Sequence, residues 1–396
     1  MKVKNINGVK TAIINMFIDP ENGFLNPLLK DDRGGALYVP EGEKTSGLMG
    51  DIIAQSTGST FILGQDYHPA NHMSFMVNHP GVMEYRVGKF KEFLAANGQE
   101  IPEGDALYEA AQQPVHFFTE GEPPVPFPFP ELVMDQNRNF IGFKEEDGRV
   151  RKVQVKTSSG QAPSEKDRGR VSKVTNEYFD KSFDEMRAEG QLLSTQTLWT
   201  KHCVQGTESS LYPADMNLPK ELKEKLEGDL LSRVIHHHDA KTGNDFYVIR
   251  KGVDSEVDSY GIGVENDGET MTGAWDVFKE IAQELKKQGV ENVVINGGGL
   301  ASNFCVEFSL NNTADFLAGH FKMRGMDVEV NFVPEISRGI PIPGGPDVPF
   351  SLDGVEERLK QSRGIGTKSL NEVLAMSAPE KKAQNGASRK FPGLAG

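Results

Sequence analysis

The stretch ENVVINGGGLASNFCVEFSL, residues 291–310, decides the fold class of this chain. Its run 292–296 is rich in Val and Ile and ends at glycine, which is typical of a short buried strand. An apolar pattern of helical period then extends over residues 304–321. A buried strand that leads directly into a helix is the repeating unit of parallel sheets with crossover helices, so the stretch predicts an α/β fold.

Four further apolar runs have the same character, because each is rich in Val, Ile or Phe and is bounded by turn or polar residues. A helical pattern at 275–288 separates the last of the early runs from the strand at 292–296. This alternation predicts a three-layer α/β sandwich with a mostly parallel central sheet. The four runs are 11–18, 60–64, 246–249 and 328–333.

Residues 79–189 interrupt this alternation and predict an inserted subdomain. A hairpin is predicted over 139–155 through the turn at Asp147 and Gly148. The proline-rich run 120–130 has too few backbone donors for a sheet, and we expect only partial order there. The predicted division is a discontinuous core of residues 1–78 and 190–376, the insertion 79–189, and a mobile tail 377–396.

Composition limits the class of partner. The 396 residues carry a formal net charge of -14, spread along the chain, which argues against a nucleic-acid or membrane surface. Two cysteines cannot form a disulfide framework in a chain of this size, which favours a reducing compartment. We therefore expect a cytoplasmic protein that acts on a small molecule, with a homo-oligomer left open.

Cys305 is the first candidate for chemistry. It stands where the helix after strand 292–296 begins, so the helix dipole is expected to lower the pKa of its thiol. Backbone N–H groups at that helix start would also point at a developing oxyanion. A lone cysteine ahead of an apolar helix is more often a packing residue, so the position alone leaves both interpretations open.

A second candidate is a metal site. Asp66, His68 and His72 directly follow the strand 60–64, and strand ends in such folds face the crevice where ligands bind. Their carboxylate and imidazoles suit a divalent cation, and His202 would complete a site with room for water or substrate. A polar loop with exposed histidines is the alternative.

Asp19 and Lys251 also follow predicted strands directly. The Asp19 carboxylate could take the thiol proton, and the Lys251 cation could stabilise the thiolate. A strand-end Asp is commonly a turn former and Lys is commonly exposed, so neither residue is decisive by itself.

Together these segments resemble the nicotinamidases, a branch of the isochorismatase-like cysteine hydrolases, in the order and approximate spacing of their motifs. The chain departs from the family pattern at Thr200, where proline is usual, and at Asn303, where aspartate is usual. It also places more than a hundred residues between His72 and Trp199, where the family has a short link. The matching segments are Asp19-x-x-Asn22-x-Phe24, Asp66-x-His68-Pro-x-x-His72, Leu198-Trp199-x-x-His202-Cys-Val-Gln-Gly-Thr207, 250–260 and 300–306.

The resemblance implies hydrolysis of nicotinamide to nicotinate and ammonia through a thioester, as a step of NAD salvage. The alternatives are an amidase for another small amide, and a weakly active scaffold whose insertion binds a partner. The insertion is expected to act as a lid or a subunit contact, because it leaves and rejoins the core beside the site. The resemblance implies a catalytic triad of Cys305 as nucleophile, Asp19 as general base and acid, and Lys251 as electrostatic support. It also implies an oxyanion hole formed by the N–H groups of Ala301 and Cys305, beside a cis peptide at Leu300. The implied substrate pocket consists of Phe24, Trp199, Tyr260 and Leu300, and one divalent metal would bind Asp66, His68, His72 and His202, with zinc first and iron or manganese as alternatives.

Overall fold

The computed structural model of the protein describes residues 3–25, 36–113, 115–116, 118, 125–157, 169–340 and 353–378. The predicted tail lies outside these residues from 379 on. Within the described part, no helix is long and apolar enough to cross a membrane.

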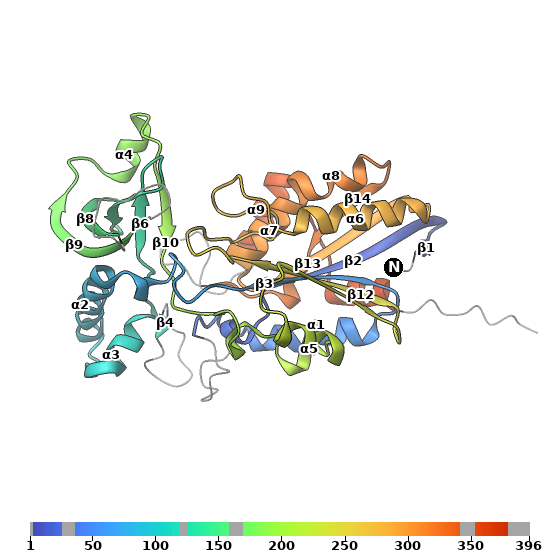
Figure 1. Ribbon diagram of the computed structural model, residues 1–396, viewed down its shortest axis with the longest axis horizontal. Coiled ribbons are helices and arrows are strands. Elements are labelled where there is room, and N and C mark those ends of the chain that lie inside the picture. Colours follow the sequence, from blue (N-terminus) through green and yellow to red (C-terminus); the bar gives the residue numbers. More distant parts are fainter. Residues whose placement is uncertain are drawn as a thin grey trace, which may run out of the picture.

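An eight-stranded sheet forms the centre of the described structure, with the strand order β11-β12-β3-β2-β13-β14-β15 and β1 paired to the start of β2 (Figure 1). Adjacent strands from β12 to β15 run parallel, whereas β11 and β1 are antiparallel to their partners. All five predicted strands are present, and the predicted fold class is confirmed. The strands are β1 Lys4–Ile6, β2 Val9–Ile18, β3 Thr60–Asp66, β11 Val234–Asp239, β12 Asn244–Lys251, β13 Asn292–Gly299, β14 Asp327–Phe332 and β15 Gly366–Thr367.

Helices cover both faces of this sheet and complete three layers (Figure 1). Successive side chains of β2 point to opposite faces: Met16 packs toward one helical layer and Phe17 toward the other. Each such fully buried side chain contributes about 1.5–3 kcal/mol, which explains the continuous apolar run in the sequence. One layer holds α6 Ala274–Lys287, α7 Glu307–Asn312, α8 Gly319–Lys322 and α9 Asp353–Arg363; the other holds α1 Glu43–Gln55, α5 Lys220–Gly228 and α10 Leu370–Ser377.

A second, antiparallel sheet lies beside the ends of the parallel strands, at the left of Figure 1, in the order β10-β6-β7-β8-β9. The predicted hairpin is present, with Lys144 opposite Val150. The sheet packs against α2. Its elements are β6 Glu131–Met134, β7 Phe140–Lys144, β8 Val150–Lys156, β9 Arg170–Tyr178 and β10 Ser194–Thr197, accompanied by α2 Pro80–Ala96, α3 Gly104–Ala111 and α4 Phe183–Ala188.

The proline-rich run is more regular than predicted over the part that the structure describes. β5 Val125–Pro126 pairs with β4 Val115–His116. The carbonyls of Phe127 and Pro128 then accept hydrogen bonds from the buried guanidinium of Arg86. The prediction counted the N–H groups that proline lacks, whereas here a side-chain donor satisfies the carbonyls.

Candidate active site

The ends of three parallel strands bring Asp19, Lys251 and Cys305 together. Asp19 follows β2, Lys251 ends β12, and Cys305 lies shortly after β13. The Lys251 Nζ atom lies 2.8 Å from Asp19 Oδ2 and 3.6 Å from Cys305 Sγ. The Asp19 carboxylate and the Cys305 thiol also lie close enough together to influence each other's pKa. A thiol, a carboxylate and an ammonium group therefore meet in one buried cluster.

Burial sets the protonation of this cluster. It raises the pKa of the Asp19 carboxyl to about 6, against the opposing effect of the Lys251 charge. It also raises the pKa of the Cys305 thiol well above its ordinary value, although Lys251 lowers it. The predicted lowering of this pKa is therefore wrong, because desolvation of the thiolate is the largest effect on it. At neutral pH these pKa shifts favour a thiol on Cys305 beside a carboxylate on Asp19.

The chain around Cys305 is tightly fixed. Gly299 has a φ of +143°, and a Cβ atom there would lie 2.0 Å from the carbonyl oxygen of Ile18, so only glycine fits. A cis peptide joins Leu300 and Ala301, as the resemblance implied. Residues Ser302–Val306 form a π-helical turn that opens the following helix. Cys305 thus lies in the first turn, between Phe304 and Val306, whose N–H groups both donate to the carbonyl of Ala301 over 3.1 Å.

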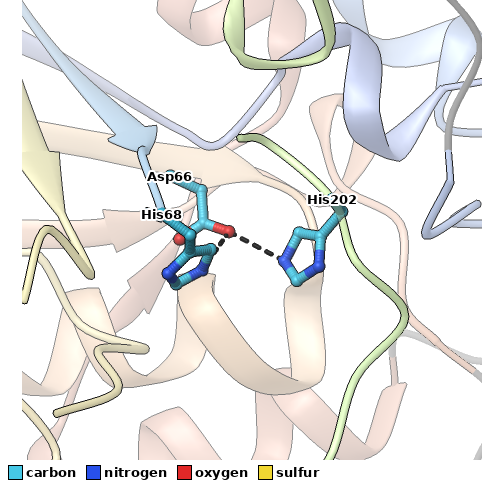
Figure 2. A group of neighbouring side chains, drawn as sticks. All are labelled: Asp66, His68 and His202. Atoms are coloured by element: carbon cyan, nitrogen blue, oxygen red, sulfur yellow. Dashed lines mark ion pairs between the residues drawn. The ribbon is translucent and has the colours of Figure 1, made fainter. Parts of the chain in front are cut away.

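Asp66, His68 and His202 converge in a second buried cluster beside the first (Figure 2). The Nε2 atoms of both histidines lie 2.9 Å from Asp66 Oδ2. The other face of this carboxylate reaches the first cluster, because Asp66 Oδ1 lies 2.8 Å from Lys251 Nζ. The two clusters therefore share one lysine and act electrostatically as one site.

The hydrogen bonds of the two imidazoles show what this cluster can hold. Nδ1 of His68 donates to the carbonyl of Gly252 over 3.0 Å, and Nδ1 of His202 donates to that of Thr200 over 2.6 Å. Because a carbonyl only accepts, each Nδ1 carries the ring proton and each Nε2 lone pair faces the Asp66 carboxylate. The Nε2 lone pairs and the Asp66 oxygen can lie this close only when a proton or a metal cation stands between them. Two imidazoles oriented through Nδ1 and one carboxylate are a donor set that fits a divalent cation.

His72, the fourth predicted ligand, stands apart from this group. Its ring centroid lies 4.2 Å from that of His68, but its Nε2 donates to Val257 over 3.1 Å and its Nδ1 bonds to the Ser74 hydroxyl over 2.7 Å. Both nitrogens are therefore engaged within the protein. His72 instead groups with His68 and Asp258, and the donor atoms of these three residues also lie close enough together to hold a metal ion.

Sequence reasoning missed two buried carboxyl groups near the site. Asp258 accepts hydrogen bonds from Gln196 Nε2 at 2.8 Å and from the N–H of Ser259 at 2.9 Å. The sequence did offer a signal for Asp258, because it stands in the segment 250–260 that also contains Lys251, two residues before Tyr260. Glu21 accepts the N–H of Asp66 over 3.2 Å, and burial followed by the charge of Asp19 raises its pKa well above the ordinary value. Burial therefore favours the neutral, protonated form of Glu21.

A narrow cavity of about 30 Å³ opens between the two clusters. The predicted pocket residues Phe24, Trp199 and Tyr260 line it, together with the oxyanion-hole candidate Ala301, whereas the fourth predicted pocket residue, Leu300, is fully buried and does not line it. This volume suits about one water molecule, so an aromatic ring enters only when a wall moves. Among the described residues, the lining also includes Leu37, Asp258, Ser259, Phe304 and Ile340, which the sequence did not point out.

The three-layer fold with cysteine, aspartate and lysine at its strand ends fits the class that the motifs resemble, the isochorismatase-like cysteine hydrolases. Within that class the chain is similar to nicotinamidases. It is 41% identical to the Escherichia coli (strain K12) nicotinamidase over 76 residues, 19% of this chain and 32% of that protein. It is 29% identical to the Acinetobacter baylyi nicotinamidase over 140 residues, 35% of this chain and 48% of that protein. The matches confirm the predicted resemblance.

The chain thus spans about a third to a half of the length of the curated relatives it matches. Among solved structures, an Acinetobacter nicotinamidase and pyrazinamidase is 18% identical with a TM-score of 0.42, covering 92% of this chain and 97% of that one. The yeast nicotinamidase bound to nicotinaldehyde is 14% identical with a TM-score of 0.44, covering 90% and 99%. No family model matches the chain.

Proposed function

We propose that this protein hydrolyses nicotinamide to nicotinate and ammonia with Cys305 as nucleophile. The observation that carries the proposal is the shared lysine: Lys251 contacts Asp19 and Cys305 on one side and the Asp66 cluster on the other. The thiol and its proposed base therefore lie next to the Asp66, His68 and His202 cluster, which would hold a heteroaromatic ring through a bound metal. The similarity to nicotinamidases supports the same substrate.

The geometry suits transfer of the acyl group from the amide nitrogen to the sulfur of Cys305 and then to water. Asp19 takes the thiol proton as Sγ of Cys305 adds to the carboxamide carbon. The N–H groups of Ala301 and Cys305 stabilise the oxyanion, and Asp19 returns the proton to the amide nitrogen, which leaves as ammonia. Water then gives a proton to Asp19 and adds to the thioester. The carboxylic acid leaves and the thiol is restored.

Lys251 keeps its charge through this cycle. Burial lowers the pKa of the ammonium, but Asp19 and Asp66 outweigh that effect and raise it well above the ordinary value. A permanent cation between the two carboxylates offsets their mutual repulsion, and it lies close enough to the sulfur to stabilise the thiolate as it forms.

The Asp66, His68 and His202 cluster would hold the metal. When bound, a divalent cation there supplies a Lewis-acidic anchor for the pyridine nitrogen. Zinc is proposed first, with iron or manganese as alternatives. This chemistry would serve NAD salvage in the cytoplasm.

The test is ammonia release by metal-loaded protein from nicotinamide, compared with a small aliphatic carboxamide at the same concentration. The proposal expects rapid release from nicotinamide and little from the aliphatic amide, because only the ring compound reaches the metal cluster. Preference for the aliphatic amide would contradict nicotinamide as substrate and would favour the alternative amidase.

The metal cluster leads to a prediction that does not depend on activity. His202→Ala is expected to lower the metal content of purified protein from about one ion per chain to a small fraction, because three donors are the minimum for a stable site. Elemental analysis of protein prepared without chelators measures this directly.

A matched control removes histidines outside the cluster. His236 and His238 lie on β11 beside Asp245 and are half exposed, so they could bind adventitious metal. Their double replacement by alanine should leave about one ion per chain. Loss of the metal in this control, with the metal retained in His202→Ala, would place the ion elsewhere.

A further inference from the structure

Phe129, from the inserted segment, packs directly behind a wall of the cavity. Its ring lies 4.9 Å from that of Trp199, centroid to centroid, at an interplanar angle of 66°. Trp199 is 5% exposed and lines the cavity, where its ring also meets Phe304 at 5.0 Å and Tyr260 at 5.9 Å. Trp199 is therefore held between a residue of the insertion and two residues of the pocket.

The segment that carries Phe129 is anchored from both sides. The buried Arg86 of α2 donates to the carbonyl of Phe127 over 3.3 Å and to that of Pro128, and its guanidinium stacks 4.2 Å above the Phe127 ring. On the other side, the carbonyl of Pro130 accepts the N–H of Leu198 over 2.9 Å. Phe129 thus sits on a segment fixed both to the insertion and to the residue that precedes Trp199.

The backbone of Trp199 is fixed independently of Phe129. Its N–H donates to Ser74 over 2.6 Å, and its carbonyl accepts from Met76 over 2.9 Å. The position of the indole ring, in contrast, depends on side-chain packing, because an unfilled space beside a ring leaves rotamer freedom. In a cavity of about 30 Å³ even a small displacement of the indole changes the space for a substrate ring.

We propose that Phe129 is a positioning residue that braces Trp199, so that the inserted segment sets the width of the substrate pocket and its selectivity for ring substituents. The effect on selectivity rests on the proposed function, because it requires that a ring substrate occupies this cavity. The bracing itself does not, and it can be measured without substrate.

Fluorescence quenching tests the bracing. The chain has two tryptophans, Trp199 and Trp275, so a Trp275→Phe background leaves Trp199 as the single reporter. In this background Phe129→Ala should raise the acrylamide quenching constant of Trp199 severalfold. The control is Phe179→Ala, which truncates a half-buried ring of the same insertion that packs in a separate cluster with Val150 and Phe183. It should leave quenching unchanged.

Kinetics test the consequence for selectivity. Phe129→Ala should raise KM for nicotinamide roughly five- to tenfold, the scale of one lost aromatic contact, with kcat within about twofold. Discrimination against a nicotinamide with one extra ring methyl group should fall by a similar factor. Phe129→Tyr, which keeps the ring, should restore both values.

The outcomes separate the two proposals. Unchanged quenching in folded Phe129→Ala would overturn the bracing, and raised quenching with unchanged KM and selectivity would overturn the role in selectivity. A wild-type protein that does not hydrolyse nicotinamide would contradict the proposed function and the selectivity claim together, while the quenching comparison would still decide whether Phe129 holds Trp199.

Discussion

Cys305→Ala is expected to lower kcat/KM for nicotinamide by roughly 10⁴-fold or more, because no other group takes over when a nucleophile is lost. Cys305 is the thiol that Lys251 and Asp19 contact, and it lines the cavity. The exchange removes one small atom from the site, so the thermal unfolding midpoint should stay close to that of the wild type.

Cys203→Ala is the matched control. Cys203 is fully buried with its sulfur against Gly23, and burial raises the pKa of its thiol well above the ordinary value. It is not among the residues that line the cavity. Its replacement should retain most activity. The reverse pattern in two folded variants, with Cys203 essential and Cys305 dispensable, would show that the nucleophile has been misassigned.

Asp19→Asn is the second variant with a large expected effect, a loss of roughly 10²- to 10⁴-fold in kcat/KM, which is the usual contribution of a general base. Burial raises the pKa of Asp19 to about 6, and only the ionised carboxylate can take the thiol proton. Wild-type kcat/KM should therefore be constant above this pKa and fall about tenfold per pH unit below it. The residual kcat/KM of Asp19→Asn should not show this fall at acidic pH.

Glu21→Gln provides the comparison for Asp19, because Glu21 is also fully buried and carries a raised pKa. A neutral acid and an amide are close in shape and charge, so the loss should be much smaller than for Asp19→Asn. Metal content is measured at each pH, since histidine ligands also take up protons in acid. An acid limb that persists unchanged in Asp19→Asn would assign the pH dependence to another group.

The core of the fold was predictable because its signals are local. The strands β2, β3 and β13 are buried on both faces, so they appear in the sequence as continuous apolar runs. Their carboxyl ends must meet at one edge of a parallel sheet, which places Asp19 near Cys305 without any knowledge of side chains. The same argument singled out Lys251, which follows a predicted strand, and the resemblance then added the ring pocket, whose residues lie too far apart along the chain for a local pattern to connect them.

The features that the sequence did not predict depend on tertiary packing. The direction of the Cys305 pKa shift follows from burial of the thiol, which helix position alone does not reveal. The place of His72 follows from hydrogen bonds to Val257 and Ser74, and only the first of these partners is distant in sequence. The order of the proline-rich segment depends on Arg86, more than thirty residues earlier, whose guanidinium has carbonyl partners that no local pattern identifies.

The most direct test of the mechanism is peptide mass spectrometry of metal-loaded protein quenched in acid during turnover of nicotinamide. The account predicts that the peptide containing Cys305 gains the mass of a nicotinoyl group in place of the thiol hydrogen, and that Cys305→Ala protein shows neither this adduct nor nicotinate formation. Nicotinate formation at the wild-type rate by Cys305→Ala protein, or the nicotinoyl mass on Cys203 in place of Cys305, would contradict it.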